Sequence, residues 1–261
     1  MKTRVCLTAV LVILLGIMLV GAGCGSGGST EDQGQGEAKP VLKVGMEATY
    51  APFEYKDEDG NITGFDADLI RAIGEEMGYD VELSYVEWDG LDPALNSEQI
   101  DAVISAVTIT EERKLEADFS EPYFEATQII AVREDSPVQG LADLVGLKVG
   151  VQANTTGQYV CEDAEIPDEN IVKYPTAPDA MMNLANGSLD AVVADAPVVL
   201  NYIVNNPEMP FKTVTDDFEK EYYGIKVKKG NTELLDKINE GLKKVKENGK
   251  FDEIHNKYFG E

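Results

Sequence analysis

Two stretches of this chain open alike: "IDAVISAVTITEER" at residues 100–113 and "LDAVVADAPVVLNY" at residues 189–202. In each copy an aspartate, Asp101 or Asp190, precedes an apolar run that ends in small or polar residues. A predicted helix then begins. Two sites of this design could face each other across a cleft, and the rest of the sequence must show whether they do.

Strand and helix patterns alternate along the chain. Residues from Phe65 onward repeat apolar side chains every four positions up to Gly78, which predicts a helix. Further helices are predicted over 176–187, where Thr176 and Asp179 have capping-box spacing, and over the tail 231–259. Alternation in two blocks predicts two α/β lobes, each a mainly parallel sheet flanked by helices. The predicted strands are 41–46, 81–88, 102–107, 147–151, 170–174 and 189–194.

The first 23 residues are predicted to be an export signal. An apolar run of 14 residues from Leu7 to Val20 follows a charged start and is short for a membrane span. The ending "VGAGC" resembles a bacterial lipoprotein signal, in which Cys24 becomes the lipidated first residue. Cleavage by the ordinary secretory route and an uncleaved membrane anchor are the alternatives. Residues 24–40 are rich in Gly, Ser and charge, which predicts a flexible tether.

Composition narrows the class of function. Forty-eight acidic against 22 basic residues give a net charge of −26, which disfavours binding to nucleic acid. Without Cys6 and Cys24 only Cys161 remains, so no internal disulfide is expected. No cluster of His and Cys has metal-ligand spacing, and neither a metal nor another cofactor is expected.

The motifs of residues 41–261 resemble those of the extracellular solute-binding proteins (family 3 type) of amino-acid ATP-binding-cassette importers. The resemblance is carried, in order, by "GMEATYAPFEY", "GNITGFDADLIRAI", "DAVISAVTITEER", "DFSEPYF", "GVQANTTG", "LDAVVAD" and "EYYGIKVKKGN". It implies a two-lobed periplasmic-binding-protein-like fold with crossovers near 125–129 and 219–224. Lobe 1 would comprise 41–126 plus 222–261, and lobe 2 would comprise 127–221. The two copies would then be equivalent strand ends, whose polar edges face one cleft.

Such a cleft must satisfy both charges of a free amino acid, because an unpaired buried charge is very unfavourable. For the carboxylate we expect the fork of Arg113, although a solvated helix-surface arginine is the alternative. Further donors are expected before a helix start and from the opposite lobe. They are the Thr108 side chain, the backbone N–H groups near Ala106 and Thr108, and the side chains of Thr155 and Thr156.

For the ammonium group we expect Asp195, with Ser105 as a further acceptor. Asp195 could instead cap the helix that contains Pro197. The resemblance places aromatic walls at Tyr50 and Trp88, although a core anchor is the alternative for Trp88. It also places an acid, Glu47, where binders of polar and basic side chains carry one, and we add Gln152 to this specificity group.

These residues predict an extracytoplasmic receptor that closes about a hinge on a basic or polar L-amino acid, with arginine, lysine or histidine favoured. Its expected partners are the free amino acid, the membrane permease and, through the lipid on Cys24, the membrane. We expect a monomer, and a periplasmic location is the alternative to anchoring. A glutamine receptor, a cyclohexadienyl dehydratase-type enzyme on the same fold and a sensor input domain are the alternatives. We predict the amino-acid receptor and no enzymatic activity.

Overall fold

The computed structural model describes residues 38–260 of the 261-residue chain. The chain from Ala38 onward forms one compact unit. The predicted signal peptide, Cys24 and all of the predicted tether before residue 38 lie outside the described residues. Within the described part, the chain has no helix that is both long and apolar enough to cross a membrane.

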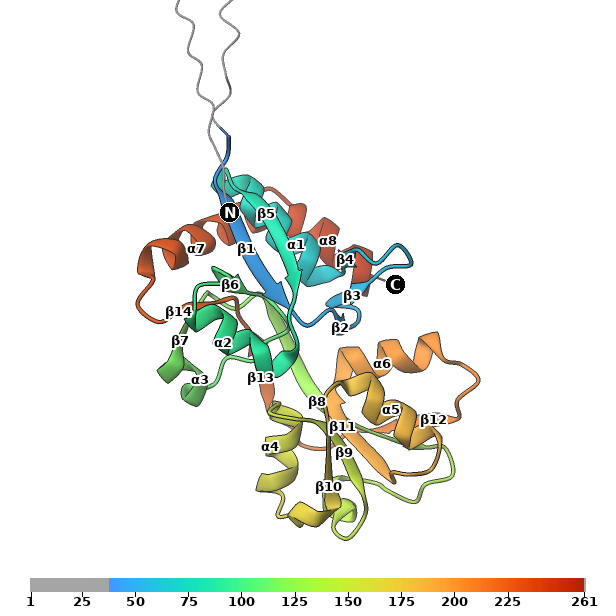
Figure 1. Cartoon of the computed structure of the whole chain (residues 1–261). Coiled ribbons are helices and arrows are strands. Elements are labelled where there is room, and N and C mark those ends of the chain that lie inside the picture. Colours follow the sequence, from blue (N-terminus) through green and yellow to red (C-terminus); the bar gives the residue numbers. More distant parts are fainter. Residues whose placement is uncertain (1–37, 261) are drawn as a thin grey trace, which may run out of the picture. The chain divides into compact units, whose positions relative to one another are not determined.

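The first lobe is built on a mixed five-stranded sheet and a small three-stranded one (Figure 1). Its strands are β1 (Val41–Met46), β2 (Thr49–Tyr50), β3 (Glu54–Lys56), β4 (Ile62–Thr63), β5 (Asp80–Tyr85), β6 (Ala102–Val103), β7 (Ala117–Phe119) and β14 (Lys226–Lys228). The larger sheet has the order β5-β1-β6-β14-β7. β1 is parallel to β5 and β6, whereas β14 is antiparallel to β6 and β7.

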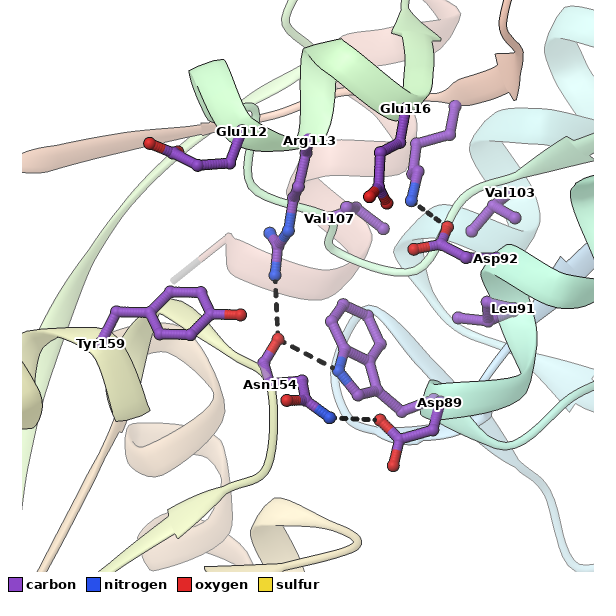
Figure 2. A pocket seen from close by; sticks show the side chains of 12 residues that line it. Asp89, Leu91, Asp92, Val103, Val107, Glu112, Arg113, Glu116, Asn154 and Tyr159 are labelled. Carbon is purple, nitrogen blue, oxygen red and sulfur yellow. Dashed lines mark hydrogen bonds and ion pairs between the residues drawn. The ribbon is translucent and has the colours of Figure 1, made fainter. Parts of the chain in front are cut away.

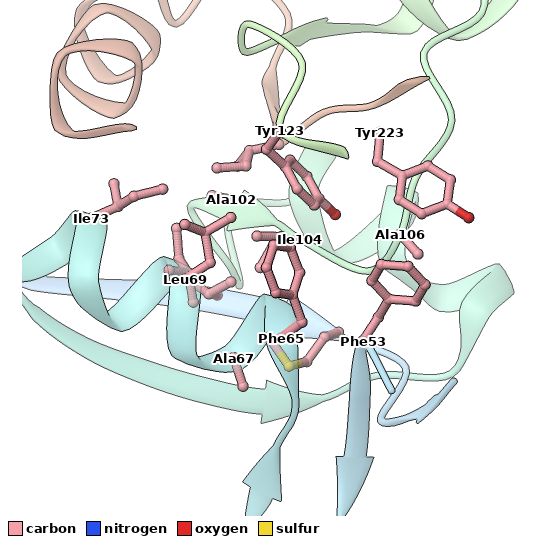
Figure 3. Close-up of a cluster of buried hydrophobic side chains, with 14 of the residues drawn as sticks. Phe53, Phe65, Ala67, Leu69, Ile73, Ala102, Ile104, Ala106, Tyr123 and Tyr223 are labelled. Carbon is pink, nitrogen blue, oxygen red and sulfur yellow. The ribbon is translucent and has the colours of Figure 1, made fainter. Parts of the chain in front are cut away.

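Helices and an aromatic core cover this sheet. The helices are α1 (Phe65–Met77), η1 (Trp88–Gly90), α2 (Leu91–Asn96), α3 (Glu111–Glu116), α7 (Thr232–Glu247) and α8 (Lys250–Phe259). α1 packs against both α7 and α8. Figure 3 shows Phe53, Phe65 and Tyr223 in the buried cluster, where the Phe53 ring meets the other two edge-on. Edge-on contact is a favoured arrangement of aromatic rings.

The second lobe is a sheet covered on both faces. Its strands are β8 (Phe124–Arg133), β9 (Val149–Gln152), β10 (Ile171–Tyr174), β11 (Ala191–Asp195), β12 (Phe211–Val214) and β13 (Lys220–Tyr223). The order is β10-β9-β11-β8-β12, and β13 pairs with β8. Helices η2 (Leu141–Leu144), α4 (Thr156–Asp163), η3 (Asp168–Asn170), α5 (Ala177–Ala185) and α6 (Ala196–Asn205) complete it. Successive β8 residues Ile129 and Ile130 belong to separate apolar clusters, because a strand alternates its side chains between faces.

Two antiparallel strands, β8 and β13, connect the lobes. β13 pairs with the first half of β8, from Phe124↔Tyr223 to Thr127↔Lys220. β8 then continues into the second sheet, where Gln128 lies opposite Asp195. The predicted crossovers near 125–129 and 219–224 fall on these strands. The lobe boundaries at 126/127 and 221/222 stay a prediction.

Both larger sheets are mixed, not mainly parallel as predicted, because β14 and β8 run antiparallel to their neighbours. Most predicted elements are present, and three of them differ in their bounds. The prediction of a strand over 102–107 is wrong beyond Val103, where β6 ends. The chain then leaves the sheet but stays buried, and it turns at Ala106, whose φ is 47°. The strand predicted over 81–88 ends at Tyr85. The predicted C-terminal helix divides into α7 and α8 at Gly249, whose φ of 81° favours glycine.

The repeated motif has equivalent contacts in the two lobes. The Asp101 carboxylate accepts the backbone N–H of Lys43 at 2.9 Å, and the Asp190 carboxylate accepts that of Lys148 at 2.9 Å. Each aspartate also donates its own N–H back to the same lysine's carbonyl. The strand that follows is parallel to β1 in the first lobe and to β9 in the second. The two copies are therefore the same structural unit, as predicted.

Candidate functional site

The carboxyl ends of the two sheets meet at Glu47 and Gln152. Glu47 follows β1, Gln152 ends β9, and the Gln152 amide donates to the Glu47 carboxylate at 2.9 Å. The Thr49 hydroxyl donates to its other oxygen at 2.6 Å. Glu47 is only 3% exposed, and this burial raises the pKa of its carboxyl group despite the two hydrogen bonds. A carboxylate from lobe 1 thus lies buried against lobe 2.

Asp195 ends the second copy of the motif and is also buried. It occupies the position before α6, but its side chain makes no capping hydrogen bond, so the capping alternative is wrong. Instead the carboxylate accepts from the Gln128 amide and the Tyr223 hydroxyl, and Tyr50 from the first lobe also hydrogen-bonds to it. Burial raises the pKa of Asp195 to about 6, and the charge of Glu221 adds to the rise.

The segment after β6 is held by buried acids. The Ser105 hydroxyl accepts the backbone N–H of Glu47 at 3.0 Å and donates to Glu54 at 2.7 Å. The N–H of Ala106 donates to Asp66 at 2.8 Å. The prediction that this N–H faces a ligand is therefore corrected: the buried Asp66 carboxylate takes it, because a buried donor must find an acceptor.

Arg113 reaches across to the other lobe rather than into solvent. Its guanidinium donates to the carbonyl of Thr108 at 2.8 Å. It also donates to the carbonyl of Asn154 at 3.2 Å (Figure 2). It lies 5.6 Å from the centre of the Trp88 ring, and the indole N–H also points to the Asn154 carbonyl at 3.4 Å. Burial lowers the pKa of Arg113. The alternative of a solvated surface arginine is wrong. Trp88 is half-buried: it packs against the apolar cluster that contains Leu91 and also lines a pocket, so its two expected roles, aromatic wall and core anchor, both keep support.

Two of the three threonine hydroxyls expected to bind a carboxylate already donate to one, that of Glu221. Thr108 and Thr156 each donate to the same oxygen of Glu221 at 2.7 Å. Gln128 donates to its other oxygen at 2.9 Å. Thr155 is not part of this group, since its hydroxyl donates to the carbonyl of Gln152 at 2.8 Å.

The predicted residues therefore fall into two connected groups. Trp88 and Arg113 line a pocket of 420 Å³ between the lobes, to which Asn154 and Tyr159 contribute from the second lobe (Figure 2). Glu47, Tyr50, Ser105, Gln152 and Asp195 are buried outside it. Hydrogen bonds through the Thr108 residue, Glu221 and Gln128 link the two groups. Among residues 38–260 no group of three or more acidic, His or Cys side chains could hold a metal ion.

Residues 42–261 match the family of bacterial extracellular solute-binding proteins, family 3. This chain belongs to that family. Family membership places this solute-binding protein outside the cytoplasm and confirms the predicted two-lobed α/β fold.

Several relatives of this solute-binding protein have named ligands. The "probable histidine-binding protein" of Neisseria gonorrhoeae is 40% identical over 238 residues, which cover 89% of each chain. The arginine-, lysine-, histidine-binding protein ArtJ from Geobacillus stearothermophilus has a TM-score of 0.82 at 44% identity, covering 85% of this chain and 96% of ArtJ. An ancestral arginine-binding protein, solved bound to glutamine, has a TM-score of 0.81 at 44% identity, covering 85% and 99%.

Sequence reasoning missed Glu221 and Gln128 in this solute-binding protein. Both lie on the crossover strands, Gln128 on β8 and Glu221 on β13. Their position on the predicted crossover segments could have identified them. A polar residue on a segment that joins two lobes at the cleft lies close to any ligand bound between the lobes. Glu221 opens the motif "EYYGIKVKKGN", but nothing in the spacing of "DDFEKEYY" marks it rather than its acidic neighbours as a site residue.

Proposed function

We propose that this solute-binding protein captures a basic L-amino acid between its lobes and delivers it to the membrane permease of an ATP-binding-cassette importer. The observation that carries the proposal is a pair of buried carboxylates, Glu47 and Asp195. Among residues 38–260 neither forms an ion pair with a lysine or arginine. A basic amino acid brings two cations, an ammonium group and a charged side chain, and its binding would neutralise both acids.

The roles of the two acids follow from their surroundings. Asp195 lies beside the Gln128–Glu221 group and the threonines, so it would bind the ammonium group next to the amino acid's carboxylate. Glu47 lies on the side of Thr49 and Gln152, so it would bind the side chain. Arg113 would supply the fork for the carboxylate, after exchanging its bonds to backbone carbonyls for stronger charge-assisted ones.

Glutamine is the second candidate ligand, and one observation favours it. Gln152 and Glu47 already form an amide–carboxylate hydrogen bond of 2.9 Å, and a ligand carboxamide could exchange with it. The ancestral relative solved with glutamine supports keeping this candidate.

Calorimetry with arginine, lysine, histidine and glutamine tests the assignment. We expect arginine to bind, and Glu47→Gln to weaken arginine by more than about tenfold, roughly 1.4 kcal/mol, while sparing glutamine. The control is Glu58→Gln, which makes the same charge change at an exposed residue outside the site. Tightest binding of glutamine, with no binding of any cationic amino acid, would contradict the cationic assignment.

Two finer points belong to the same proposal. The absence of an enzymatic role is tested by incubating the pure protein with cyclohexadienyl acids, whose turnover would favour the dehydratase alternative. Lipid anchoring through Cys24 is supported by the "VGAGC" ending. Fractionation of cells tests the anchor, and recovery of the full-length protein only in the soluble fraction would contradict it.

A further inference from the structure

Glu221 is an anion held by neutral donors from three segments. Its carboxylate takes the hydroxyls of Thr108 and Thr156 and the amide of Gln128, at 2.7, 2.7 and 2.9 Å. Thr108 precedes α3 in the first lobe, Thr156 begins α4, and Gln128 lies on β8. Within the described residues Glu221 forms no ion pair with a lysine or arginine. This is the donor set that an amino acid's carboxylate would use.

The same donors cannot serve two carboxylates at once. A threonine hydroxyl has a single hydrogen to donate, and both hydroxyl hydrogens point to one oxygen of Glu221. A ligand carboxylate that takes these hydroxyls must therefore remove Glu221 from them. Hydrogen bonds to a charged acceptor are about twice as strong as neutral ones, so this exchange opposes binding measurably.

A pocket next to the threonines can accommodate the Glu221 side chain when it is displaced. Glu221 is only partly buried and lines this pocket, of 650 Å³, together with Thr108, Gln128 and Thr156. Water in an open pocket can solvate a carboxylate, so its release does not leave a buried charge unpaired. Glu47 and Asp195, which are almost fully buried, have no comparable escape.

We propose that Glu221 is an internal occupant of the carboxylate-binding donors, and that an incoming amino acid binds by displacing it. This inference rests on the proposed function. It adds Glu221 as a residue that lowers the affinity of the site for its ligand by competing for the same donors. Ligands that lack a carboxylate cannot replace Glu221 on the threonines, so it also favours free amino acids over their decarboxylated analogues.

Displacement would also place the two charged ends of the ligand next to each other. The Gln128 amide donates to Asp195 as well as to Glu221, and the nearby charge of Glu221 contributes to the raised pKa of Asp195. The ligand's carboxylate would bring an equal charge to the donors that Glu221 leaves, so the ligand's own ammonium group, and not the departure of Glu221, would favour the ionised form of Asp195. The two charged groups of one amino acid would thus bind next to each other on either side of Gln128.

A fixed interlobe latch is the competing interpretation of the same contacts. A latch would hold Thr108 and Thr156 through Glu221 whether or not a ligand is present. Removing it would weaken ligand binding or leave it unchanged. Displacement predicts the opposite sign, because loss of the internal occupant frees the donors for the ligand.

Calorimetry with arginine on Glu221→Ala and Glu221→Gln distinguishes displacement from a fixed interlobe latch. We expect Glu221→Ala to bind arginine at least about fivefold tighter than wild type, since the charge-assisted hydrogen bonds from both threonines to the competing carboxylate are lost. Glu221→Gln should show a smaller gain, because an amide oxygen still accepts from the threonines but without a charge. Glu219→Ala, an exposed acid on the same segment, makes the same charge change and should stay within about twofold.

Each outcome decides the question. Unchanged or weaker arginine binding by Glu221→Ala overturns the inference. If that variant does not fold, Glu221→Gln decides by the sign of its effect. Wild-type protein that binds none of the amino acids tested would instead overturn the proposed function, which is a distinct result.

Discussion

At the scale of single residues, the buried Asp195 makes ligand binding depend on pH. Its pKa of about 6 lies above the ordinary value of 3.8, chiefly because of burial, and binding of an ammonium group requires the ionised form. As the pH falls through 6, Asp195 takes up a proton and the affinity for arginine falls, by at most about tenfold per pH unit. The raised pKa of Glu47 acts in the same direction.

Calorimetry between pH 5 and pH 8 measures this dependence. Thermal melting at each pH is the control for loss of folded protein. A dissociation constant for arginine that is the same at pH 5 and pH 7 would remove Asp195 from the binding site.

At this scale the family resemblance singled out Glu47 and decided for Arg113 over a surface arginine. The structure buries Glu47 and Asp195 and brings Arg113 against the second lobe, and their roles in binding stay a prediction. The direction of the Ala106 N–H was not predictable, since it depends on Asp66, 40 positions away. Contacts of this kind follow from tertiary packing, which no local spacing encodes.

At the scale of elements, two buried acids fasten β3 and α1 to the segment after β6. Glu54 and Asp66 are both 0% exposed and hold Ser105 and Ala106. Burial, together with the nearby charge of Asp66, raises the pKa of Glu54. Each of the two has one buried carboxylate oxygen without a hydrogen-bond partner. Two buried carboxylates this close cannot both be charged, so the pair retains a proton, and burial raises the pKa of Asp66 to about 7.

This pair should make the protein less stable as the pH rises. Below pH 3.8 Asp66 is protonated in both the folded and unfolded chains, whereas between about 4 and 7 only the unfolded chain loses the proton. The free energy of unfolding therefore decreases across this range, by up to about 4 kcal/mol from Asp66, and Glu54, whose pKa burial also raises well above its ordinary value, adds to the decrease. Glu54→Gln should flatten the decrease, because the amide can donate to an ionised Asp66.

Thermal or urea unfolding at pH 5 and pH 8 compares Glu54→Gln with wild type and with Glu58→Gln, an exposed acid in the following turn. Equal slopes in all three proteins would show that the pair shares no proton.

Element boundaries were predictable where local chemistry sets them. Gly78, with φ of 75°, ends α1 as predicted, and the Thr176 hydroxyl accepts the N–H of Asp179 at the start of α5. The end of β6 was not predictable. Residues 104–107 are buried and, apart from Ser105, apolar like a strand, but they leave the sheet to reach Asp66 and Glu54, so hydrophobicity alone could not reveal where β6 ends.

At the scale of the whole molecule, the acidic surface complements a cationic ligand. The sequence carries a net charge of −26, and the described surface contains many exposed Asp and Glu side chains. A negative field raises the local concentration of cations and so raises the association rate of a cationic amino acid. Glutamine has no net charge and should gain little from this field.

Stopped-flow measurement of the arginine association rate at increasing salt tests this steering. We expect the rate to fall by about tenfold between roughly 10 mM and 500 mM salt, because the screening length shrinks from about 30 Å to a few Å over that range. If glutamine binds, its association rate is the matched control and should change by less than about twofold, since a neutral zwitterion is steered weakly. An arginine rate independent of salt would mean that the charge of the molecule serves solubility rather than capture. The equilibrium contacts of Glu47 and Asp195, which are buried and poorly screened, would then carry all of the preference for a cation.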